Sequence, residues 1–179
     1  MSIRDNRPLL WLNVATLGGL LAYVVGIYLH VVLLGQEWGN VLVVGTIAIA
    51  GRTGGIALVF VIYTLVLSIT LYFAAFRGLN LFLCWFWILS WYQCAVNEFL
   101  YYFGLPNEPV NLFFKAAFPT LWYPAKELVF IALALLFTFL GRRKFMTRPF
   151  NKVDYALVAL VSGGMLYAIV MSQISYLNR

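Results

Sequence analysis

The chain has 179 residues, of which 64% are apolar and 10% are charged. Soluble domains carry about 25% charged residues, so this composition excludes folding in water and predicts an integral membrane protein. The net charge is +6, but the basic residues gather in short loops and near the N-terminus. We expect them to orient the chain in a membrane and to face anionic headgroups, and we expect no nucleic-acid partner.

Five apolar stretches are long enough to cross a bilayer, which takes about 20 mostly apolar residues per helix. They are residues 9–34, 56–76, 79–103, 124–140 and 155–176. We therefore predict an all-α bundle of five transmembrane helices that forms a single membrane domain over residues 1–179. The first stretch exceeds the length of a signal-peptide apolar region, so it is interpreted as a retained span.

Turn and cap residues predict where these helices begin and end. Pro124 suits the first turn of the fourth helix, and Gly104 and Gly141 follow apolar spans as stop signals. The Arg77-Gly78 pair is expected to be a two-residue link between the second and third spans. That link makes the two helices antiparallel neighbours.

Two stretches outside the spans are unusually apolar. Residues 40–52 are too short to cross and are predicted to form a re-entrant, hairpin or interfacial segment after the first helix. Residues 106–123 combine several aromatic residues with the polar residues Asn107, Glu108 and Lys115. They are predicted to form an amphipathic element in the outer headgroup layer before the fourth helix.

Basic residues divide unequally between the two sides of a five-span chain, eight against four. Because Lys and Arg in short loops favour the cytoplasm, this bias predicts a cytoplasmic N-terminus and an extracytoplasmic C-terminus. We expect the membrane to be a plasma membrane, specifically a bacterial inner membrane. The richer side holds Arg4, Arg7, Arg77, Arg142, Arg143, Lys144, Arg148 and Lys152, and the other holds Arg52, Lys115, Lys126 and Arg179.

The third span is the most polar. Ser90, Gln93, Cys94 and Asn97 share one helical face, and Glu98 adjoins them. Carboxylates inside a membrane are functional candidates, although Glu98 lies near the end of its span, where hydrogen bonds or partial hydration could satisfy it.

Lys126 and Glu127 fall at a similar depth in the fourth span, so a pair between Glu98 and Lys126 is geometrically feasible. Alternatively, Glu127 stabilises a helix N-terminus and Lys126 snorkels to the interface.

We therefore predict a non-enzymatic membrane protein that binds a lipid headgroup or a partner membrane protein through an outer-leaflet polar pocket. The pocket residues are Gln93, Asn97, Glu98, Lys126 and Glu127. One alternative is a small transporter or channel in which Glu98 selects cations, and another is an accessory subunit of a larger membrane complex. Too little polarity is expected in the inner half of the third span for a conducting path.

No catalytic, cofactor or metal site is predicted. His30 is the lone histidine, whereas a metal would need several further ligands. Cys84 and Cys94 lie ten residues apart in one predicted helix, about 15 Å, which is too far for a disulfide.

Small residues recur at every fourth position in the first and last spans. These stripes are Gly18, Ala22, Gly26 and Gly164, Ala168, Ser172. Such stripes permit close helix approach. We expect the first span to pack against the last through them, with oligomerisation as the alternative.

The order of the spans and the outer stretch from Gly104 to Lys126 resemble the five-span membrane domains of lipid A phosphoethanolamine transferases. The resemblance implies a cytoplasmic N-terminus and amphipathic elements between the third and fourth spans. It implies no chemistry, because the site residues of those enzymes have no match in this sequence.

Overall fold

The computed structural model describes residues 7–28, 54–105, 109–119 and 121–177. Helices form nearly all of this part of the chain, and it contains no strand, which confirms the all-α prediction. The elements are α1 (Arg7–Tyr28), α3 (Gly54–Tyr72), the 3-10 helix η3 (Ala74–Phe76), α4 (Arg77–Tyr102), α5 (Pro109–Ala117), α6 (Trp122–Phe145) and α7 (Lys152–Leu177).

Four of the described helices are long and apolar enough to cross a membrane. They contain the segments Arg7–Gly26, Ala74–Tyr102, Trp122–Phe145 and Lys152–Met171. In α3 the apolar segment found is the shorter Phe60–Tyr72. Residues 40–52, the end of the first predicted span and His30 lie outside the described residues.

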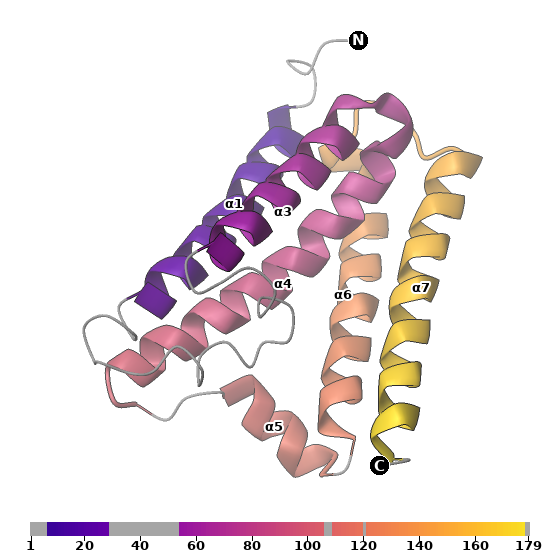
Figure 1. Cartoon of the computed structure of the whole chain (residues 1–179). Helices are drawn as coiled ribbons and strands as arrows, with labels where there is room; N and C mark the ends of the chain where they lie inside the picture. The colour runs from indigo at the N-terminus through magenta and orange to yellow at the C-terminus, as the bar shows by residue number, and fades with distance from the viewer. Residues whose placement is uncertain (1–6, 29–53, 106–108, 120, 178–179) are drawn as a thin grey trace.

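Helix α4 is the centre of the bundle and contacts α1, α3, α6 and α7. Figure 1 shows α1 and α3 on one side of it, with α6 and α7 on the other. The start of α1, the α3–α4 turn and the α6–α7 loop lie together, and we call this the basic end. The short helix α5 lies at the opposite end, between the end of α4 and the start of α6, and we call this the α5 end.

Apolar packing runs along both sides of α4. Toward α6 and α7, the cluster around Phe82 includes Ile131 and Val158, all at most 2% exposed. Large apolar side chains on the outer faces stay uncovered, for example Leu140 and Leu160, at 71% and 72% exposed. In a membrane these faces contact acyl chains, so their exposure costs nothing there.

The link between α3 and α4 differs from the prediction. Helix α3 ends at Tyr72, the turn occupies residues 73–76, and Arg77 and Gly78 begin α4. A Cβ on Gly78 would lie 2.5 Å from Oδ1 of Asp154 at the start of α7. This glycine is therefore required by close packing of a second helix, which single-sequence turn signals do not separate from a true turn.

The two predicted stop glycines behave differently. Gly104 ends α4 with φ of 65°, and the amide of Leu105 donates to the carbonyl of Leu100 at 2.9 Å, as in a Schellman motif. Gly141 does not end a helix, because α6 continues to Phe145. A Cβ at Gly141 would lie 3.1 Å from the Phe145 ring, so this glycine makes room for that ring.

The small-residue stripe of the first helix packs against α4. A Cβ on Gly26 would lie 2.8 Å from the Cβ of Glu98, and one on Gly18 would lie 3.8 Å from the hydroxyl of Tyr92. Gly19, beside the stripe, packs closer still, since a Cβ there would lie 2.7 Å from the ring of Tyr92. The expected packing of the first span against the last is therefore wrong, because α4 is the main neighbour of α1. On α7, a Cβ at Gly164 would meet nothing within 4 Å. Oligomerisation through that stripe stays a prediction.

Candidate functional site

Three of the predicted site residues lie in the second half of α4. Gln93, Asn97 and Glu98 are half-buried. Glu98 packs against Gly26 of α1, where the glycine lets the two backbones approach closely. Oδ1 of Asn97 is buried without a hydrogen-bond partner, and a buried unsatisfied acceptor of this kind costs about 1–3 kcal/mol.

The other two predicted residues lie in the first turns of α6. Lys126 is 8% exposed, its Nζ donates to Oδ1 of Asn111 on α5 at 3.2 Å, and Oε1 of Glu127 lies 3.5 Å from the same Nζ. The described contacts thus bring Lys126 and Glu127 together and place Glu98 against α1. A single pocket that holds all five residues remains a prediction.

Aromatic rings complete the surroundings of Lys126. Nζ of Lys126 lies 5.5 Å from the ring centroid of Tyr123 and 5.9 Å from that of Trp122. Nζ of Lys115 lies 4.9 Å from the same Trp122 ring, within the range of a cation–π contact. We call the set of Asn111, Lys115, Trp122, Tyr123, Lys126 and Glu127 the α5–α6 corner.

Sequence reasoning did not select Asn111, Lys115 or Trp122 as site residues. Their spacing could have indicated a shared surface. Asn111 and Lys115 on α5 are four residues apart, and so are Trp122 and Lys126 on α6. Residues at that separation share a helix face. What the spacing could not give is that these two faces meet.

Helix α5 has the amphipathic character expected of residues 106–123, within the shorter range Pro109–Ala117. Asn111 and Phe114 are buried against the bundle, whereas Leu112 and Phe113 are 52% and 66% exposed. A helix with one packed face and exposed apolar side chains suits the boundary between headgroups and acyl chains. The corner therefore lies at the depth of lipid headgroups if the bundle spans a bilayer.

A second polar group lies at the opposite half of the bundle, where α1, α3 and α4 meet. Asn13 and Asn80 exchange hydrogen bonds through their side-chain amides at 2.8 and 2.9 Å. Nδ2 of Asn80 also lies 2.9 Å from Oγ1 of Thr70 and 3.1 Å from the carbonyl of Leu67. We call Asn13, Thr70 and Asn80 the amide cluster.

The amide cluster is closed. Its three residues are at most 7% exposed, Asn13 also donates to the carbonyl of Leu9, and the Thr70 hydroxyl donates to the carbonyl of Val66. These donors and acceptors satisfy one another, which is how buried polar groups become structural. The cluster adds Asn13 of α1 to Asn80 of α4, and it does not form an open path.

The basic end is held by a buried carboxylate. Asp154 is 0% exposed and accepts two hydrogen bonds from the Arg148 guanidinium, at 2.6 and 2.9 Å. It also accepts from the amides of Gly78 and Asn151, at 3.2 and 2.9 Å. Because the amide of Asp154 donates to Oδ1 of Asn151 at 3.0 Å, the pair forms a capping box for α7.

Arg148 extends this arrangement to the turn before α4. Its Nη2 donates to the carbonyl of Ala74 at 2.6 Å. One arginine and one aspartate therefore fasten the α6–α7 loop to the α3–α4 turn. We call Asp154, Arg148, Gly78 and Asn151 the Asp154 cluster.

The described residues contain no group of three or more His, Cys, Asp or Glu side chains arranged to hold a metal ion. The Cys84 thiol is buried, and the Cys94 side chain is half-buried. Comparison with known protein families, with curated proteins and with solved structures finds no match to this chain.

Proposed function

We propose that this chain is a non-enzymatic integral membrane protein that binds the headgroup of a zwitterionic phospholipid at the α5–α6 corner. The observation that carries the proposal is the pairing of Lys126 with Glu127 at 3.5 Å directly beneath an amphipathic helix. Opposite charges side by side, at headgroup depth, match a headgroup that carries a phosphate and an ammonium.

The charges of the corner suit such a ligand. Lys115 is exposed and lies over Trp122, so it is accessible to a lipid phosphate, and an ammonium–phosphate contact is charge-assisted. The side chain of Lys126 is 10% exposed and that of Glu127 is 19% exposed. Among the residues of the corner, Glu127 is the acid, and its carboxylate would receive the ammonium.

The transporter alternative is less well supported. A conducting path needs polar groups through the whole thickness of the membrane, and the amide cluster satisfies itself in the inner half. Glu98 also lies against α1 through Gly26. An accessory subunit would instead retain a stoichiometric partner protein when the chain is extracted gently.

Native mass spectrometry of the full chain in mild detergent with added phosphatidylethanolamine tests the proposal. The double variant Lys115→Gln, Lys126→Gln should lose retained phospholipid. The matched control Lys144→Gln, Lys152→Gln, which removes the same charge at the basic end, should keep it. Equal retention by both variants would overturn the proposal, and so would a stoichiometric protein subunit retained in place of lipid.

We also propose that α3 completes a five-span bundle whose basic end faces the cytoplasm of a bacterial inner membrane. Among the described residues, seven Lys and Arg belong to the basic end and two to the α5 end. This bias favours a cytoplasmic basic end. A C-terminal reporter active only in the cytoplasm should then be silent, and strong activity would contradict five spans with this orientation.

A further inference from the structure

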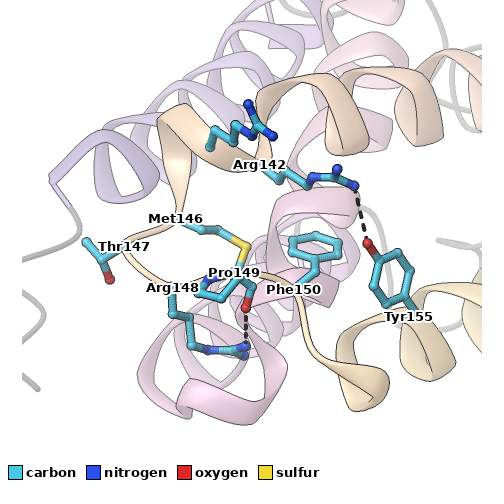
Figure 2. A pocket seen from close by; sticks show the side chains of 8 residues that line it. Arg142, Met146, Thr147, Arg148, Pro149, Phe150 and Tyr155 are labelled. Atoms are coloured by element: carbon cyan, nitrogen blue, oxygen red, sulfur yellow. Dashed lines mark hydrogen bonds between the residues drawn. The ribbon is translucent and has the colours of Figure 1, made fainter.

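A cavity of about 360 Å³ opens at the basic end, beside the loop that joins α6 to α7. Its lining residues are Arg142, Arg143, Met146, Thr147, Arg148, Pro149, Phe150 and Tyr155. Three of these carry a positive charge, and none is acidic. Figure 2 shows the side chains of Arg142 and Tyr155 directed toward each other at one side of this cavity.

The three arginines are not equivalent. Arg148 is committed to the Asp154 cluster by both of its terminal nitrogens, so its charge is neutralised by a buried carboxylate. Arg142 donates from Nη1 to the Tyr155 hydroxyl at 3.2 Å, which is a neutral partner. Arg143 is exposed. Two positive charges at the cavity therefore belong to residues that are not used by that cluster.

The Tyr155 ring packs between two other aromatic rings. The Tyr155 ring stacks on Phe139 with centroids 5.8 Å apart and meets Phe150 edge-on at 5.5 Å. Phe139 and Phe150 contact each other at 6.0 Å. Because the ring is held on two sides, its hydroxyl can hold the Arg142 guanidinium in one place, as a preorganised site requires.

The capping of α6 accounts for the charges but not for the cavity. Arginines in the last turn of a helix stabilise its C-terminus through the macrodipole, and this holds for Arg142 and Arg143 in α6. A helix terminus needs no hollow and no tyrosine hydroxyl beside it. The guanidinium fork is the group that matches phosphate oxygens two at a time.

We infer that this cavity, the arginine pocket, binds a phosphate group, with Arg142 and Arg143 as the contacting residues and Tyr155 as the residue that positions Arg142. The ligand class is a phosphomonoester or inorganic phosphate, since the pocket offers cations and no acid to receive an ammonium. This site is separate from the α5–α6 corner, at the opposite end of the bundle, and does not depend on the function proposed there.

The test uses the full chain in phosphatidylcholine-containing micelles with phosphatidic acid as the probe, and native mass spectrometry counts the retained phosphatidic acid. The variant Arg142→Gln, Arg143→Gln should lower the affinity about 10-fold or more, since each lost charged hydrogen bond is worth roughly that factor. The control Lys144→Gln, Lys152→Gln removes the same charge from the same end but not from the lining of the pocket. It should leave the affinity nearly unchanged, because Lys144 and Lys152 are exposed and lie outside the pocket lining, where exposed charges contribute little.

Two further measurements define the ligand and the positioning role. Tyr155→Phe should weaken phosphatidic acid retention a few-fold while Arg143→Gln still weakens it further. Inorganic phosphate in excess should leave the lipid in place if the source is a lipid, and should displace it if the source is a soluble phosphate. Both of these results support a phosphate site.

Equal losses in the arginine variant and in the lysine control would overturn the inference, because that result describes diffuse attraction to a basic surface. Undiminished retention in the arginine variant would overturn it as well. To separate these results from misfolding, the thermal stability of each variant is measured in the same micelles. A stable arginine variant with unchanged retention leaves no role for the pocket.

Discussion

The polar clusters near the two ends of this bundle differ in how far they satisfy their own hydrogen bonds. Around the basic end, Asp154 is completely buried and accepts four hydrogen bonds, and the nearby amide cluster pairs its own donors and acceptors. Toward the α5 end, the side-chain oxygen of Asn97 is buried without a hydrogen-bond partner. There Lys126 contacts one amide oxygen, of Asn111, and one carboxylate, of Glu127. One set of polar groups is complete in itself, and the other has capacity left.

Whether a polar group already has its hydrogen-bond partners within the protein distinguishes structural from binding residues better than its polarity alone does. In a membrane, a polar group that is already satisfied within the protein holds helices together and gains little from a ligand. A polar group that is only partly satisfied gains when a ligand arrives. Substitutions in the Asp154 cluster and in the amide cluster should therefore change stability, and those at the α5–α6 corner should chiefly change binding.

The largest loss of stability is expected for Asp154→Ala. The substitution leaves Arg148 and two backbone amides without their acceptor, and breaking a buried pair costs about 3–5 kcal/mol. Because the Arg148 side chain is 20% exposed, we expect about 3 kcal/mol, measured by equilibrium unfolding in mixed micelles. Lys152→Ala, at an exposed neighbour, is the control. Equal stability of the two variants would refute a structural role for the Asp154 cluster.

A smaller loss is expected for Gly78→Ala. The added Cβ would lie 2.5 Å from Oδ1 and 2.8 Å from Cβ of Asp154, so α7 must shift, and overpacking of this kind costs about 1–3 kcal/mol. Gly163→Ala is the matched control in a helix, because a Cβ there meets nothing within 4 Å. It should leave stability unchanged or raise it. Comparable losses at both positions would show that helix flexibility, and not the contact with Asp154, sets the requirement.

The amide cluster should give the smallest of these stability effects. Hydrogen bonds between membrane helices average about 0.6 kcal/mol and reach about 1.7. A double-mutant cycle of Asn13→Ala and Asn80→Ala should give a coupling energy of about 1–2 kcal/mol, because the two amides exchange two bonds. Additive single effects would mean that the two side chains do not act as a pair.

The sequence was sufficient for the helices and for much of their ends. Apolar runs of membrane length predict α1, α4, α6 and α7, and Gly104 predicts the end of α4. It was not sufficient for glycines whose role is set by a neighbouring side chain. Gly78 and Gly141 read as a turn and a stop, but their neighbours are Asp154 and the Phe145 ring.

The polar groups show the same limit. Asn151 and Asp154 have the spacing of a capping box, so the start of α7 could have been predicted from the sequence. The pairing of Asn13 with Asn80 could not, because the residues are 67 positions apart and nothing local links them. The position of Lys126 and Glu127 in the fourth span predicts their depth. The contact of Lys126 with Asn111 could not be predicted, because it depends on how α5 folds back onto α6.

The most direct test compares how much phosphatidylethanolamine stabilises the delipidated chain in three forms. A ligand that binds only the folded state raises its unfolding free energy by an amount set by its affinity. The wild type and Asn80→Ala should gain the same increment, although Asn80→Ala starts from lower stability. The double variant Lys115→Gln, Lys126→Gln should start near the wild type and gain almost nothing. An unchanged increment in the double variant, or a lost one in Asn80→Ala, would contradict a division between the structural amide cluster and the binding α5–α6 corner.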